Sequence, residues 1–126
     1  MDNCKVNGYF QGMIVRGGTV NISNSTITND YPSDEWLHYF DNKEWGSGNA
    51  VNLAALTIGN KSPNAYQYPA SVTLTNTKVE SLCKYPAVYM WGNEGEGLGA
   101  SLVYDDATEI IGDIIAGNDA CTVNGN

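Results

Sequence analysis

Basic residues are scarce in this chain. Six Lys and Arg residues stand against fourteen Asp and Glu, which gives a formal net charge of −8. Nucleic acids and anionic membrane surfaces are bound through clustered Lys and Arg, so this balance argues against both partners. Histidine occurs once, at His38, and arginine once, at Arg16. A zinc centre or a Ser-His-Asp site therefore has little support.

Long apolar runs are also missing. No stretch approaches the roughly 20 residues that span a bilayer, so we expect no membrane insertion. The first residues lack the basic start and apolar core of a signal peptide. The composition is low in Lys and Glu but rich in Asn, Gly, Thr and Tyr, which favours export. We therefore expect an extracellular or cell-surface location, with this sequence being part of a longer exported chain.

Cysteine is limited to three residues, and three thiols cannot all pair. A disulfide framework is therefore not expected. We expect small buried thiols that fill a core, at Cys4, Cys83 and Cys121.

A ten-residue phrase, by contrast, occurs twice, at residues 19–28 and 71–80. Each copy alternates apolar and polar residues, then has an Asn, then a β-branched apolar residue three positions later. A period of two predicts a strand with one buried face. Shorter copies of the Asn part begin at Asn3 and, with one extra residue and Asp for Asn, at Asp106.

A second short strand follows each phrase, at residues 49–53, 86–90 and 114–116. A constant phrase at unequal spacings is typical of a β-solenoid in which coils stack and loops vary in length. The residues expected to point inward are Val20, Ile22, Val51, Leu53, Val72, Leu74, Val88 and Met90. The same strand content also permits an antiparallel β-sandwich or meander.

The pattern of Val-x-Ile followed by Asn at a corner resembles the parallel β-helix of the pectin-lyase-like proteins, from Asn3 to about Gly117. Pectate lyases, polygalacturonases, phage tailspikes and many bacterial surface proteins share that fold. The resemblance implies an all-β, single-stranded right-handed parallel β-helix of about four coils. The length of 126 residues predicts one domain, residues 1–126. It also implies that corner amides stack, so we expect an asparagine ladder of Asn3, Asn24, Asn76 and Asp106.

Residues 29–48 form the longest interruption of the pattern. An N-cap and acids at its start predict a short helix near Ser33–Phe40. Aromatic and acidic side chains occur together here and in a second loop, which suits stacking on sugar rings and hydrogen bonding to hydroxyls. The candidate ligand-binding residues are Trp36, Tyr39, Asp41, Glu44, Trp45, Tyr89, Trp91 and Glu94. The alternative is that the aromatic residues only pack the loops down or cap the solenoid.

Support for catalysis is thin. The Asn-Thr-Asp, Gly-Asp-Asp and Gly-His-Gly motifs of polygalacturonases are absent, and no acidic cluster surrounds Arg16 as in pectate lyases. Glycoside hydrolysis would need two carboxylates roughly 5–10 Å apart. The available pairs are Asp34/Glu35, Asp41/Glu44, Glu94/Glu96 and Asp105/Asp106. We expect no catalytic residues, no metal and no cofactor, although calcium could bind Glu94, Glu96 or Asp105.

Three functions remain open. We expect a non-catalytic, adhesin-like β-helix module of a bacterial surface or secreted protein, in contact with glycans or a host-surface ligand. The alternatives are a carbohydrate-active enzyme or a fragment of one, and a purely structural repeat that stacks end to end, because open solenoid ends expose unpaired strand edges.

Overall fold

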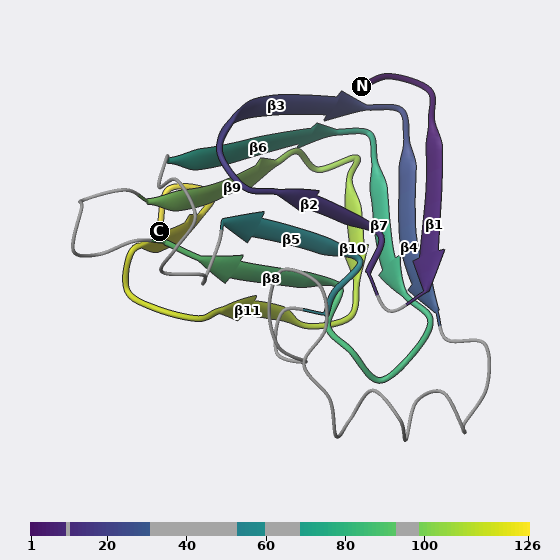
Figure 1. Ribbon diagram of the computed structural model, residues 1–126. Coiled ribbons are helices and arrows are strands. Elements are labelled where there is room, and N and C mark those ends of the chain that lie inside the picture. The colour runs from purple at the N-terminus through teal and green to yellow at the C-terminus, as the bar shows by residue number, and fades with distance from the viewer. Residues whose placement is uncertain (10, 31–52, 60–68, 93–98) are drawn as a thin grey trace.

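The computed structural model describes residues 1–9, 11–30, 53–59, 69–92 and 99–126. Over these residues the regular elements are twelve strands, arranged as three parallel sheets of four (Figure 1). This confirms the predicted parallel β-helix of about four coils. It excludes the antiparallel sandwich, because every pairing between the named strands is parallel.

Each coil contributes one strand to each sheet. The sheet that we call sheet A contains β3 (Gly18–Ser23), β6 (Ala70–Thr75), β9 (Ala100–Tyr104) and β12 (Cys121–Val123). Sheet B contains β1 (Lys5–Tyr9), β4 (Thr26–Asp30), β7 (Lys78–Ser81) and β10 (Glu109–Ile111). Sheet C contains β2 (Met13–Val15), β5 (Leu56–Gly59), β8 (Val88–Trp91) and β11 (Ile114–Ala116).

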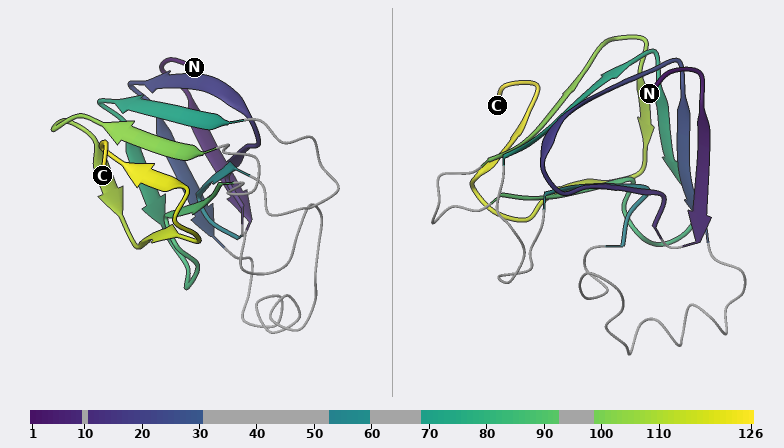
Figure 2. Two further views of the ribbon diagram at one scale, coloured as in Figure 1. Left: turned by 90° about the vertical axis from the view of Figure 1, so that its left-hand side faces the viewer. Right: turned by 45° about the horizontal axis from the view of Figure 1, so that its top comes forward.

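The sheets form three sides of a prism, seen nearly along its length in the right-hand view of Figure 2. The register is strict. Lys5 lies beside Thr26, Thr26 beside Lys78, and Lys78 beside Glu109. Equivalent residues of successive coils therefore stack in columns, about 4.8 Å apart as in any sheet.

The core consists of the inward columns of all three sheets. Ile22, Val72, Leu74, Val88 and Met90 are buried, as predicted. Val20 is partly buried and packs against the core, while Leu53 is buried. Val51 and the expected helix near Ser33–Phe40 lie outside the described residues.

One strand differs from the sequence expectation. Between β2 and β8 in sheet C lies β5, Leu56–Gly59. Of the strand expected at residues 49–53, residues 49–52 lie outside the described part of the chain, and Leu53 precedes β5. All four residues of β5 are buried, including the polar Thr57 between Leu56 and Ile58, so the strand is covered on both faces.

The cysteine expectation was wrong in part. The three thiols are free, but Cys4 is exposed and Cys83 and Cys121 are only partly buried. Cys4 lies just before β1, in the first coil, and Cys121 begins β12, in the last.

Candidate functional site

The corner between sheets A and B is short and built on left-handed asparagines. Asn3, Asn24 and Asn76 have φ of 53°, 51° and 45°. Asparagine tolerates this conformation better than other residues with a side chain, because its amide can hydrogen-bond locally. The three residues therefore turn the chain sharply from one sheet into the next.

The side chains at this corner form a ladder. Asn76 Nδ2 donates to Asn24 Oδ1 at 2.9 Å, and Asn24 Nδ2 donates to Asp2 Oδ1 at 3.0 Å. The first step of this ladder joins Asp2 to Asn24, whereas the sequence analysis predicted Asn3 at that position. Asp2 also accepts from Ser23 Oγ at 2.8 Å. The hydroxyl of Ser23, followed by the amide of Asn24, lowers the pKa of the Asp2 carboxyl group.

The fourth corner has a different geometry. Asp105, rather than the expected Asp106, accepts from Asn76 N at 3.1 Å and from Thr108 Oγ1 at 2.8 Å. The extra residue closes a turn in which Thr108 N donates to Asp105 O at 3.2 Å. The hydroxyl of Thr108, followed by the backbone N–H of Asn76, lowers the pKa of the Asp105 carboxyl group. A carboxyl held ionised in this way is unsuited to act as a general acid.

A second, buried ladder lies directly beneath the asparagines. Cys4 N donates to Ser25 Oγ at 3.1 Å, Ser25 N to Thr77 Oγ1 at 3.4 Å, and Thr77 N to Thr108 Oγ1 at 3.2 Å. Sequence reasoning missed it. The signal was the small hydroxyl residue that follows the corner asparagine in both full phrases. Both ladders engage their polar groups within the corner, which makes this edge of the prism structural.

The other two corners both border sheet C and carry the long connections. Residues 31–55 join β4 to β5, residues 60–69 join β5 to β6, and residues 92–99 join β8 to β9. The corner between sheets A and B has nothing comparable: residues 24–25, 76–77 and 105–108 make its turns. Of the candidate ligand-binding residues, six lie outside the described part of the chain: Trp36, Tyr39, Asp41, Glu44, Trp45 and Glu94.

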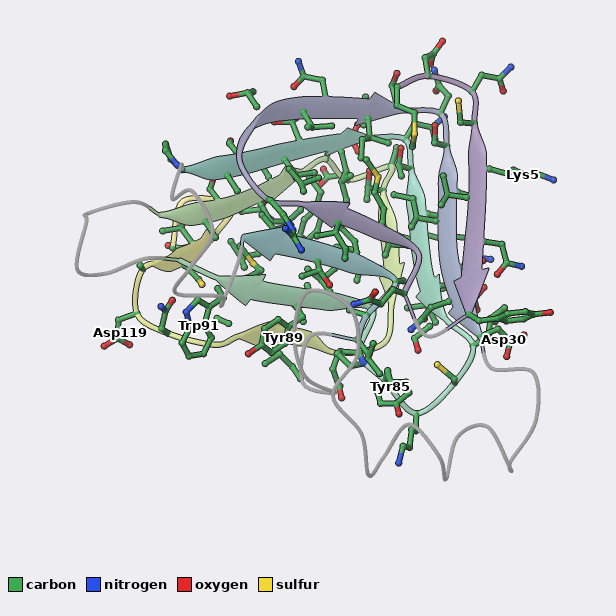
Figure 3. The ribbon with its side chains drawn as sticks, in the orientation of Figure 1. Lys5, Asp30, Tyr85, Tyr89, Trp91 and Asp119 are labelled. Atoms are coloured by element: carbon green, nitrogen blue, oxygen red, sulfur yellow. The ribbon has the colours of Figure 1, made fainter. Side chains whose placement is uncertain are left out.

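Tyr89 and Trp91, the other two candidates, lie on β8 two positions apart and so leave the strand on the same side (Figure 3). Tyr89 is only 6% exposed. Burial, followed by the nearby Cys121 thiol, raises the pKa of its phenol. A buried ring cannot stack on a ligand at the surface, so Tyr89 contributes to packing.

Trp91 is partly exposed and lies at the corner between sheets C and A. A Cβ added to Gly117 would stand 2.4 Å from Trp91 Cε3, so the ring lies directly over that glycine. The side chain of the next residue, Asn118, hydrogen-bonds to the backbone of Gly92, the residue that follows β8. Its Oδ1 accepts from Gly92 N at 3.1 Å, and its Nδ2 donates to Gly92 O. Trp91 is therefore held on a rigid, glycine-backed corner.

No group of three or more His, Cys, Asp or Glu side chains is placed to hold a metal ion among the described residues. Over the same residues, no helix has the length and apolarity to cross a membrane.

Comparisons with known proteins supply no relative. No protein-family model, no curated protein and no solved structure matches the chain.

Proposed function

We propose that this chain is a non-catalytic β-helix module of a bacterial surface or secreted protein, in which the prism displays ligand-contacting loops. The ligand class is a glycan, bound on the side of sheet C. The pectin-lyase-like resemblance and the extracellular location belong to the same proposal.

The observation that carries it is the unequal use of the three corners. The corner between sheets A and B repeats the same short, hydrogen-bonded turn. The two corners that border sheet C accept connections of very different length. Loops on a rigid scaffold are where binding residues concentrate, since they can vary without disturbing the core. The side of sheet C is thus the side where recognition can be built.

Trp91 supports the choice of ligand. Of the two candidate residues that the structure describes, Trp91 is the one that is partly exposed, and its ring is held against Gly117. An immobilised indole loses little conformational entropy when a flat apolar sugar face stacks on it. The other two tryptophans of the chain, Trp36 and Trp45, fall within the connection from β4 to β5.

The test is a glycan-array screen of the full chain beside three variants. Trp91→Leu removes the fixed indole, and the double variant Trp36→Ala/Trp45→Ala removes the loop indoles. Tyr9→Ala is the matched control, because Tyr9 is 68% exposed but lies on sheet B. Thermal unfolding of each variant establishes that it is folded before binding is compared.

Binding that the tryptophan variants lose and Tyr9→Ala keeps would support recognition on the side of sheet C. Any bound glycan is then incubated with the protein and its products analysed, since turnover would replace this proposal with the enzymatic one. Binding that only Tyr9→Ala loses, or no binding to any glycan at high protein concentration, would contradict it.

A further inference from the structure

The corner between sheets C and A differs between the third and fourth coils. Residues 92–99 join β8 to β9, whereas the shorter stretch 117–120 joins β11 to β12. The strands on either side are paired in register, β8 with β11 and β9 with β12. A connection that is longer than its neighbour cannot pair with it residue by residue, so its two ends need anchors of another kind.

The backbone of sheet C shows where the first anchor is needed. Ala116 lies beside Met90, and Gly117 N donates to Met90 O at 2.8 Å. In a parallel pair such bonds recur at every second residue. The next step would join Gly92 N to Gly117 O, and Asp119 N to Gly92 O.

Asn118 makes that step with its side chain. Its Oδ1 accepts from Gly92 N at 3.1 Å, and its Nδ2 donates to Gly92 O. A side-chain amide carries the same donor and acceptor as a peptide group, so it can replace one in a ladder. Cys121 Sγ donates to the same Oδ1 at 3.2 Å. A flipped amide would turn its NH₂ group toward two donors, so these contacts fix its orientation.

The other end of the longer connection is anchored by backbone. Ala100 N donates to Ala120 O at 3.0 Å, and a Cβ on Gly99 would stand 3.1 Å from the same carbonyl oxygen. Residues 117–120 therefore contact both ends of the connection that follows Trp91. Of these two anchors, the one at Asn118 depends on a side chain, so a substitution can remove it selectively.

Trp91 lies between two contacts with the fourth coil, at the end of β8 (Figure 3). On one side Met90 O accepts from Gly117 N, and on the other Gly92 is held by Asn118. Gly92 is buried, while Trp91 itself is partly exposed. The backbone on both sides of a residue sets the direction in which its side chain leaves, so holding Gly92 also directs the indole.

We propose that Asn118 is a positioning residue of the recognition corner: its amide replaces a backbone step of sheet C, holds Gly92 and thereby fixes the indole of Trp91 for a ligand. The consequence for binding rests on the proposed function. Without the amide, the indole would sample more orientations and would have to be ordered when a glycan binds. Ordering one side chain weakens affinity about two- to tenfold.

The first measurement follows Trp91 without any ligand. The background Trp36→Phe/Trp45→Phe leaves Trp91 as the single tryptophan of the chain. Acrylamide quenching and fluorescence anisotropy then report how freely its indole moves. Asn118→Ala should raise the quenching constant and lower the anisotropy. Asn118→Asp keeps an acceptor for Gly92 N but loses the donor to Gly92 O, and should shift both quantities in the same direction.

Two controls separate positioning from a general loss of stability. Asn21→Ala removes an exposed asparagine side chain on sheet A and should leave the quenching unchanged. Thr77→Val weakens the corner between sheets A and B and should also leave it unchanged, with circular dichroism establishing that each variant is folded. The proposal is overturned if Thr77→Val raises the quenching as much as Asn118→Ala does, or if Asn118→Ala does not raise it.

The second measurement is binding on the same glycan array, with all three tryptophans in place. Asn118→Ala should bind about two- to tenfold more weakly than the unaltered chain, and Asn21→Ala should bind equally well. Equal binding by Asn118→Ala, despite a more mobile indole, would overturn the role in recognition. If the unaltered chain binds no glycan, the proposed function fails, and the quenching data alone decide whether Asn118 positions Trp91.

Discussion

Asn76 donates a hydrogen bond from its side-chain amide to the side-chain oxygen of Asn24 at 2.9 Å, across 52 positions of sequence. Both residues have a left-handed backbone conformation, and both are exposed. The connection that separates them contains the longest insertion of the chain, yet the corner geometry repeats from one coil to the next. The A–B corner is thus the point at which successive coils are aligned.

Replacing Asn76 separates the two contributions of the corner residue. Asn76→Gly keeps the positive φ and loses the amide bonds, so we expect a loss of about 0.5–1.5 kcal/mol in unfolding free energy. Asn76→Ala also incurs the left-handed penalty of about 1–2 kcal/mol. Urea unfolding followed by circular dichroism measures both. Equal losses for the two variants would mean that backbone strain does not contribute.

The buried hydroxyl ladder is tested at Thr77, which is 2% exposed. Thr77→Val keeps the shape but removes the acceptor for Ser25 N and the donor to Thr75 O. Leaving buried groups unsatisfied should cost about 1–3 kcal/mol in urea unfolding. Thr73→Val, on the outer side of sheet A, is the matched control, with an expected change within about 0.5 kcal/mol. Similar effects at both positions would argue against the ladder.

Acid should weaken the fourth corner through Asp105. Its pKa in the folded protein is below the ordinary value, so its contribution to stability is present above the unfolded pKa of about 3.9. That contribution is lost as pH falls through the lower folded pKa. Asp105→Asn retains an acceptor oxygen but does not titrate, and should therefore lose less stability between neutral and acid pH. Unfolding curves over a pH series compare the two proteins, and parallel pH profiles would contradict the assignment.

The glycine beneath Trp91 should not tolerate a side chain. In Gly117→Ala the new Cβ would stand 2.4 Å from Trp91 Cε3 and 2.9 Å from Met90 O, and overpacking of this kind costs about 1–3 kcal/mol. Gly99→Ala is the comparison, with a smaller expected loss, since its new Cβ would make one tight contact, with Ala120 O at 3.1 Å. A double-mutant cycle with Trp91→Leu should recover part of the loss. Full additivity would show that the ring does not press on Gly117.

Part of the architecture could be predicted because the alternation of apolar and polar residues along a strand involves only neighbouring residues. The alternation in β3 and β6 identified Ile22, Val72 and Leu74 as core before any partner was known. β5 was missed although Leu56, Thr57 and Ile58 alternate, because a four-residue strand spans only two periods of the pattern. Tyr89 was expected to contact ligand and is instead buried, since sequence period indicates which side of a strand a residue faces but not what covers that side.

The sequence alone determined that the chain makes half-buried strands turned by left-handed corners, because alternation and asparagine act within a few residues. Only the tertiary structure decided which residues stack. Asp2 and Asp105 join the corner ladder, and Ser25, Thr77 and Thr108 form a second ladder beneath it. Stacking depends on register between coils that are separated by insertions of unequal length, and that register arises only when the backbone hydrogen bonds and the buried columns of three sheets are satisfied together.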